Sequence, residues 1–217
     1  MKFQAIIFDL DGTLLNTLSD LGNAVNRVLT KHDYPTHLLD DYRFFVGDGA
    51  RMLITRALPP QKREDSTINT CLKEFLEDYE QNADIDTDLY DGIAEMLDKL
   101  RDFGIKLAVL SNKPHQSAIK CMEAYFSKWK FEIILGQKEK IPRKPDPEGA
   151  LLIARQIGLP VSSFLYIGDS GVDMKTAVSA GMFPAGALWG FRTETELKDN
   201  GAKALLNHPA DLFDLIG

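Results

Sequence analysis

Cysteine is scarce in this chain, whose 217 residues include only Cys71 and Cys121. The two are far apart in the sequence and form no CxxC pair, which excludes a disulfide framework and a zinc knuckle. We therefore expect both to be buried core or helix-face residues.

Positive charge is also in short supply. Lysine and arginine together number 25 against 32 aspartates and glutamates, giving a formal net charge of -7 and a pI near 5.1. Nucleic-acid binding usually needs a basic surface, so a DNA or RNA partner is not expected.

The sequence lacks long apolar runs. None reaches membrane-spanning length, and the first residues show no basic region followed by a long apolar stretch and a cleavage site. We expect a cytoplasmic protein without a membrane partner. The apolar fraction of 44% and the charged fraction of 26% are typical of a folded domain. We expect either a monomer or a dimer, and composition does not choose between them.

Short apolar segments alternate with helical patterns along most of the chain. Four such segments read as buried parallel strands, each ending in polar or glycine residues: Phe3–Phe8, Ile105–Leu110, Phe131–Leu135 and Phe164–Ile167. Helices are predicted between and after them, over Ile93–Leu100, Ala150–Ile157 and Met174–Ala180. This alternation predicts an α/β fold with a Rossmann-like parallel sheet flanked by helices.

The stretch after the first strand breaks this alternation. It carries two apolar stripes at helical spacing, one from Leu18 to Val28 and one from Ile68 to Tyr79, but no convincing strand. We therefore predict a small all-α domain inserted at residues 15–86, with residues 1–14 and 87–217 forming the α/β core.

Asp9 and Asp11 stand two residues apart directly after the first strand, in the segment Asp9-Leu10-Asp11-Gly12-Thr13. Open α/β sheets place their ligand sites at this end of the strands. A tight Asp-Gly turn without chemistry is the alternative interpretation.

Three later segments carry matching chemistry. Ser111 and Asn112 can offer a hydroxyl, an amide and backbone N–H groups to phosphate oxygens, and Lys144 lies in a proline-restricted loop that could aim its ammonium at an anion. Asp169 and Asp173 follow another strand and suit an oxygen-ligated cation. Taken singly, each segment also has a structural interpretation: helix capping for Ser111-Asn112 and for Asp169–Asp173, and a solvated surface position for Lys144.

The four segments together resemble the motifs of the haloacid dehalogenase-like superfamily of aspartate-nucleophile phosphatases, in the same order. The helical insertion resembles the small α-helical cap of that family, and the segments Phe45–Arg51 and Trp189–Arg192 resemble its phosphoglycolate phosphatase branch. Asn16 departs from that branch, which more often has aspartate there.

The resemblance implies a Mg²⁺-dependent phosphatase that acts on a small phosphorylated metabolite through an aspartyl-phosphate intermediate. It assigns Asp9 as nucleophile and Asp11 as general acid and base, with Ser111 and Lys144 also catalytic. The metal ligands it implies are Asp9, Asp11, Asp169 and Asp173, and Thr13 and Asn112 are predicted to bind substrate.

Gly47, Gly49 and Arg51 are the predicted substrate contacts of the inserted domain. Two glycines let backbone amides approach a ligand, and the arginine could pair with a substrate carboxylate such as that of phosphoglycolate. A glycine turn that begins a helix, with an exposed arginine, is the competing interpretation.

The same residues bear on which activity of the superfamily this chain has. Asp11 argues against dehalogenation, because a halide leaving group needs no general acid. A phosphotransferase resembling β-phosphoglucomutase remains an alternative, as does, with less support, a signalling module switched by phosphorylation of Asp9.

Overall fold

The computed structural model describes residues 3–82 and 85–216. The chain divides into two compact units, one formed by Met1–Leu15 with Leu89–Gly217 and the other by Asn16–Asp88. The chain crosses from one unit to the other at two short strands, β2 (Leu15–Asn16) and β3 (Asp88–Leu89).

A six-stranded sheet forms the centre of the larger unit, in the order β5-β4-β1-β6-β7-β8. All its strand pairs are parallel. This confirms the predicted α/β fold. The strands are β1 (Ala5–Phe8), β4 (Lys106–Pro114), β5 (Ile133–Gln137), β6 (Phe164–Gly168), β7 (Phe183–Ala187) and β8 (Ala204–Leu206).

The position of β1 decides where the site lies. It pairs with β4 on one side and with β6 on the other, so the chain order reverses direction across it. Ligands of open α/β sheets bind at such a switch point, beyond the carboxyl ends of the strands. The residues that directly follow β1 therefore occupy the favoured position.

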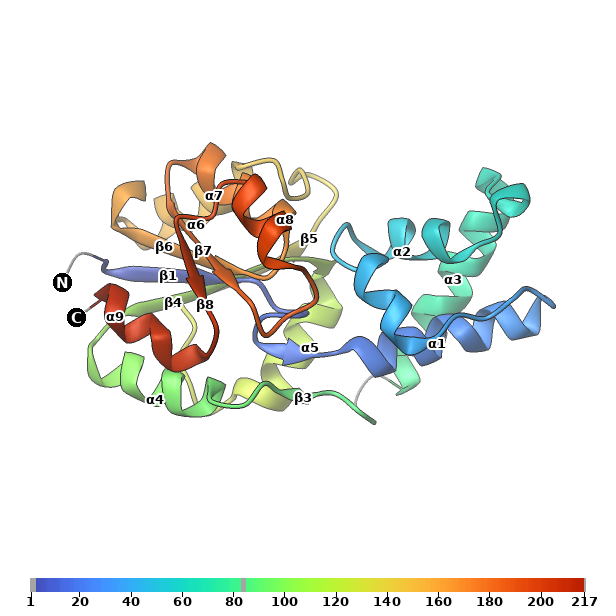
Figure 1. Ribbon diagram of the computed structural model, residues 1–217, viewed down its shortest axis with the longest axis horizontal. Coiled ribbons are helices and arrows are strands. Elements are labelled where there is room, and N and C mark those ends of the chain that lie inside the picture. The colour runs from blue at the N-terminus through green and yellow to red at the C-terminus, as the bar shows by residue number, and fades with distance from the viewer. Residues whose placement is uncertain (1–2, 83–84, 217) are drawn as a thin grey trace. The chain divides into compact units, whose positions relative to one another are not determined.

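Helices cover both faces of this sheet, as Figure 1 shows. One face packs on α4 (Ile93–Asp102), α5 (His115–Phe126) and α9 (Phe213–Ile216), and the other on α6 (Glu148–Ile157) and α7 (Gly171–Ala180). Alternate residues of β1 enter the two cores, because successive side chains of a strand point to opposite faces: Ile6 and Phe8 to one, Ala5 and Ile7 to the other. The unit is completed by α8 (Glu194–Asp199) and the 3₁₀ turns η3 (Val161–Ser163) and η4 (Pro209–Leu212).

The strands β7 and β8 lacked a clear pattern in the sequence. β7 has the sequence Phe-Pro-Ala-Gly-Ala, and proline and glycine are poor indicators of a strand interior. It is nevertheless central, because β6 and β8 pair with it on its two sides. Tertiary pairing outweighs local propensity here.

The smaller unit is helical and follows the first strand, as predicted. It contains α1 (Leu18–Lys31), α2 (Ala50–Ala57) and α3 (Asp65–Asn82), with 3₁₀ turns η1 (Leu39–Phe44) and η2 (Pro60–Lys62). The stripe from Leu18 to Val28 is buried on α1, whereas Leu76 of the second stripe is exposed on α3. Asp20 of α1 is buried and accepts a 2.6 Å hydrogen bond from the hydroxyl of Thr87, which ties the two ends of this unit together.

Among the described residues, no helix combines the length and the apolar character needed to cross a membrane.

Candidate active site

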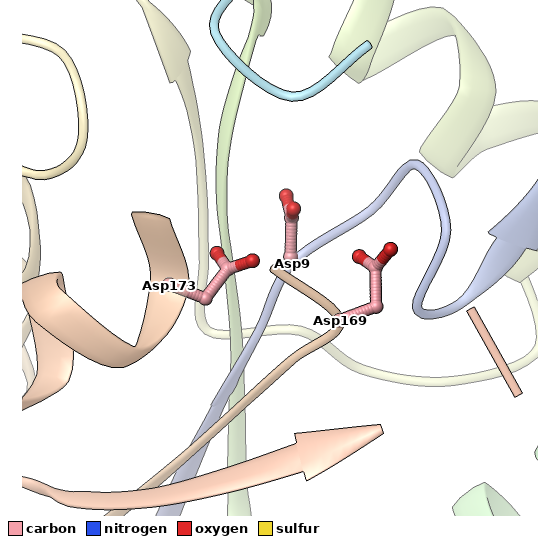
Figure 2. A group of neighbouring side chains, drawn as sticks. All are labelled: Asp9, Asp169 and Asp173. Carbon is pink, nitrogen blue, oxygen red and sulfur yellow. The ribbon is translucent and has the colours of Figure 1, made fainter. Parts of the chain in front are cut away.

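Three carboxylates meet beyond the carboxyl ends of β1 and β6. Asp9 follows β1, Asp169 follows β6, and Asp173 lies in the first turn of α7; all are buried. Each offers an oxygen within 4.8 Å of the others, and Figure 2 shows Asp169 and Asp173 on either side of Asp9.

Lys144 joins two of these carboxylates. Its Nζ lies 2.8 Å from Oδ1 of Asp9 and 2.6 Å from Oδ1 of Asp173, and its side chain is almost fully buried. A buried ammonium needs such partners, because desolvation is costly without them. The proline-flanked loop therefore does aim Lys144 into the cluster.

Asn112 holds the backbone of Lys144 in place. Its amide nitrogen donates to the Lys144 carbonyl oxygen at 3.1 Å, and its amide oxygen accepts from the Lys144 N–H at 2.9 Å. The side chain thus clamps the loop after β5 to the end of β4. A role of Asn112 in substrate binding stays a prediction.

Ser111 is buried at the same strand end. Its Oγ accepts a 3.1 Å hydrogen bond from the backbone N–H of Lys113. This contact orients the hydroxyl beside Asn112 and Lys113; its predicted contact with phosphate is not tested by the geometry.

Both oxygens of Asp173 are engaged. Oδ1 accepts from Lys144, and Oδ2 accepts from the backbone N–H of Ser170 at 3.1 Å and from the Ser170 hydroxyl at 2.5 Å. Ser170 is in turn the N-cap of α7 and accepts from the Asp173 N–H. These contacts fix the orientation of the Asp173 carboxylate within the cluster.

Asp169 is held from two sides. Oδ1 accepts a 3.1 Å hydrogen bond from the hydroxyl of Thr13, and Oδ2 accepts a 2.8 Å bond from the backbone N–H of Phe191. The buried Thr13 therefore contacts a carboxylate of the cluster, while its predicted substrate contact remains untested.

Asp11 has a partner that the sequence interpretation left without a role. The Nζ of Lys113 lies 3.0 Å from Oδ1 of Asp11, and both side chains are largely buried. Lys113 directly follows the Ser111-Asn112 pair. Its place two residues after a predicted site serine is the feature of the sequence that could have identified it as a site residue.

Three further residues belong to the site although no role was predicted for them. Ser170 bonds Asp173, Phe191 bonds Asp169, and Trp189 donates from its indole N–H to the Thr13 carbonyl oxygen at 2.9 Å. The segment Trp189–Arg192 stood out in the sequence only by family resemblance, which gave no contact.

The electrostatics of the cluster favour a cation. Burial raises the pKa of Asp9 well above its usual value, and the negative charge of Asp173 raises it further, with Lys144 opposing. Burial and Asp173 likewise raise the pKa of Asp169 to about 7, against the hydrogen bonds from Phe191 and Thr13. Burial works against the charged form of Lys144, but Asp173 and Asp9 outweigh it and raise the pKa of that ammonium.

The donor set fits Mg²⁺. Among the described residues the group consists of three carboxylates with the single ammonium of Lys144, so a divalent cation would balance the remaining negative charge. Carboxylate oxygens are the ligands that this hard cation prefers.

Gly47, Gly49 and Arg51 lie in the smaller unit. Both glycines have positive φ angles, of 115° and 87°, and α2 begins directly after Gly49. The Arg51 guanidinium donates to Asn69 at 2.6 Å and to Asp65 at 2.5 Å, both on α3. These contacts favour the interpretation as a glycine turn that begins a helix.

The sequence also matches a known protein family. Residues 6–187 match the sequence model of a family described as haloacid dehalogenase-like hydrolase. That range contains Asp9, Lys113, Lys144, Asp169 and Asp173.

Individual relatives are phosphatases. A phosphoglycolate phosphatase from Xanthomonas campestris pv. campestris (strain 8004) is 31% identical, over 99% of this chain and 97% of its own length. An N-acetylmuramic acid 6-phosphate phosphatase from Pseudomonas aeruginosa is 29% identical, over 100% of this chain and 96% of its own. A crystal structure from Lactobacillus delbrueckii subsp. bulgaricus, of a protein proposed to be a phosphoglycolate phosphatase, is similar with a TM-score of 0.93 at 30% identity, covering 100% of this chain and 99% of that one.

Proposed function

This chain belongs to the haloacid dehalogenase-like hydrolases and is a phosphatase, and we propose that it hydrolyses a small phosphomonoester through a covalent intermediate on Asp9, with Mg²⁺ as cofactor. The observation that carries the proposal is the buried Asp9 carboxylate, which meets Lys144, Asp169 and Asp173 at the switch point of a parallel sheet.

In the first step the Asp9 carboxylate attacks phosphorus, and the bond from phosphorus to the ester oxygen breaks. Asp11 gives its proton to the departing oxygen, so an alcohol leaves and an aspartyl phosphate remains. The contact with Lys113 holds the side chain of Asp11 within the site.

In the second step a water molecule attacks the aspartyl phosphate and gives its proton to Asp11. The bond between Asp9 and phosphorus breaks, which releases inorganic phosphate and restores both carboxyl groups. Lys144 and Ser111 would stabilise the phosphoryl oxygens in both steps.

Mg²⁺ would be held by Asp9, the backbone carbonyl of Asp11 and Asp169, with Asp173 acting directly or through water. When bound, it would offset the repulsion between the Asp9 carboxylate and the phosphate dianion.

We propose phosphoglycolate or a similarly small carboxylated phosphate as the substrate, in a cytoplasmic setting, with the smaller unit (Asn16–Asp88) as a cap that selects it. The Xanthomonas relative supports this substrate class. The Pseudomonas aeruginosa relative, matched over the whole chain, makes an amino-sugar phosphate the second candidate.

A phosphate-release assay over a panel of phosphorylated metabolites would test the proposal. We expect release with Mg²⁺, none after addition of EDTA, and recovery when Mg²⁺ is restored in excess. Activity that persists in chelator would refute the metal requirement. Isomerised sugar phosphate without free phosphate would identify a phosphotransferase instead.

A further inference from the structure

We propose that the segment Leu188–Arg192, here named the 188–192 loop, is a positioning element that fixes the Mg²⁺ ligands in place before the ion binds. This inference rests on the metal requirement proposed above. It assigns a role to Trp189 and Gly190, which lie after β7 and outside the four motifs.

The loop fixes one oxygen of Asp169 directly. The backbone N–H of Phe191 donates to Oδ2 at 2.8 Å, while Thr13 donates to Oδ1 at 3.1 Å. Each carboxylate oxygen thus accepts one hydrogen bond, and the rotation of the group about its last bond is restricted.

Trp189 connects the loop to the turn that follows β1. Its indole N–H donates to the carbonyl oxygen of Thr13 at 2.9 Å, across 176 positions of sequence. Thr13 belongs to the turn that also contains Asp11, whose carbonyl is a proposed ligand. One loop therefore supports ligands from both β1 and β6.

Gly190 allows these contacts to form. A Cβ at this position would overlap with the Cβ of Asp169 and with the carbonyl oxygen of Gly12, and would lie 2.7 Å from Cγ of Asp169. A side chain is therefore excluded where the loop passes between the two ligand-bearing turns.

Both ends of the loop are anchored. The backbone N–H of Leu188 donates to Leu206 of β8 at 2.9 Å. Arg192 lies 3.4 Å from Glu196, and Glu196 accepts a 3.0 Å bond from the N–H of Gly171, the first residue of α7. The loop is therefore connected to the helix that carries Asp173 as well.

Such support sets metal affinity. Partners that orient metal ligands typically contribute about 10- to 100-fold in affinity or activity, because a ligand that must be ordered on binding loses conformational entropy. We expect Trp189→Phe, which replaces the indole by a smaller aromatic ring and removes the N–H, to weaken Mg²⁺ binding by about tenfold.

Isothermal titration calorimetry with MgCl₂ on the full chain tests this without relying on activity. Trp129→Phe is the matched control, because the indole of Trp129 also donates to an oxygen of the same unit, that of Asp98 at 3.0 Å, and no metal ligand is involved. We expect the control to keep the wild-type dissociation constant within about twofold, well below the effect of losing a ligand's partner.

The outcomes separate the two proposals. A wild-type chain that does not bind Mg²⁺ would refute the metal site itself. Equal dissociation constants for wild type and Trp189→Phe would overturn the positioning role and leave the metal site intact.

A second measurement covers the case in which Trp189→Phe fails to fold. In the Trp129→Phe variant Trp189 is the remaining tryptophan, so its emission reports on the loop alone. Because the loop is in place before the ion binds, we expect this emission to be the same in EDTA and in Mg²⁺ under conditions in which calorimetry detects binding. A shift of the emission on addition of Mg²⁺, absent with NaCl at equal ionic strength, would show that the ion orders the loop and would overturn the proposal.

Discussion

Asp9 is the residue at which function and stability oppose each other. Its carboxylate is buried beside Asp169 and Asp173, and Lys144 is shared between Asp9 and Asp173. Burial and the neighbouring negative charge both raise the pKa of Asp9, which means that the charged form destabilises the metal-free fold. A buried carboxyl group whose pKa is shifted by burial and neighbouring charge is typical of an active site.

Asp9→Asn should therefore abolish phosphate release while preserving the fold, because the amide keeps the shape and removes the attacking charge. In EDTA we expect its melting temperature to equal or exceed that of the wild type, since one of three crowded negative charges is gone. Circular dichroism melts and a phosphate assay measure the two effects. Phosphate release near the wild-type rate would refute the covalent mechanism.

Asp11→Asn should affect substrates according to their leaving groups. A general acid contributes about 10²- to 10⁴-fold, and an alkyl phosphate needs that proton far more than an aryl phosphate does. We expect turnover of both to fall, with aspartyl phosphate accumulating when an aryl phosphate is supplied. Acid-quench labelling of Asp9 measures the intermediate. Unlabelled protein together with unchanged aryl phosphate turnover would contradict the assignment of Asp11.

Among the elements, the first turn of α7 combines a helix cap with support of the site. Ser170 caps the helix and bonds Asp173, which in turn holds Lys144. The N-terminus of a helix also favours negative charge through its dipole. The N-cap of α7 therefore both stabilises the helix and orients a carboxylate of the site.

Ser170→Ala should lower both stability and activity. Loss of an N-cap typically costs about 1 kcal/mol, and here Asp173 also loses the hydroxyl that orients it. Thr193→Ala is a suitable control, because Thr193 caps α8 in the same way and accepts from the N–H of Glu196 at 3.3 Å. We expect similar losses of melting temperature, but a reduced kcat only for Ser170→Ala. An equal kcat for both variants would assign Ser170 to capping alone.

Arg51 connects two helices of the smaller unit. Its guanidinium contacts Asn69 and the exposed Asp65, and exposed ion pairs contribute at most about 1 kcal/mol. We expect Arg51→Ala to change kcat/KM less than about threefold, a small fraction of what a charge-assisted bond to substrate contributes. Assays with phosphoglycolate and an uncharged aryl phosphate would check this. A selective loss of about tenfold or more on phosphoglycolate would instead assign Arg51 to its carboxylate.

At the scale of the whole molecule, the negative charge at the site should link stability to the metal. A ligand that binds only the folded state stabilises it by about 2.7 kcal/mol at 100 times its dissociation constant. For a chain of this size that corresponds to a rise of roughly 5–10 °C in melting temperature.

Thermal melts in Mg²⁺ and in EDTA would measure this rise, with NaCl at equal ionic strength as the control for screening. The shift should belong to the transition of the larger unit, which contains the site. Identical melting temperatures in Mg²⁺ and EDTA would show that the carboxylate cluster does not bind the ion in the folded state.

The sequence by itself determined four of the parallel strands, several of their helices, and the motifs that lie at the carboxyl ends of the strands. Apolar runs and helical periodicity are local properties, so they identified β1, β4, β5 and β6 without knowledge of the fold. The motifs that follow these strands could be predicted to lie close together in space, because parallel strands have their carboxyl ends at one edge of the sheet. The family and the phosphatase activity followed from those motifs and are confirmed.

Only the tertiary structure decided which side chains pair across that edge. Lys113 meets Asp11 across 102 positions, and Trp189 meets Thr13 across 176. Such contacts depend on strand order, register and loop path, none of which has a local signature. The same holds for Asn112, whose amide clamps Lys144, and for β7, whose Pro-Ala-Gly sequence becomes a strand because its neighbours supply the pairing.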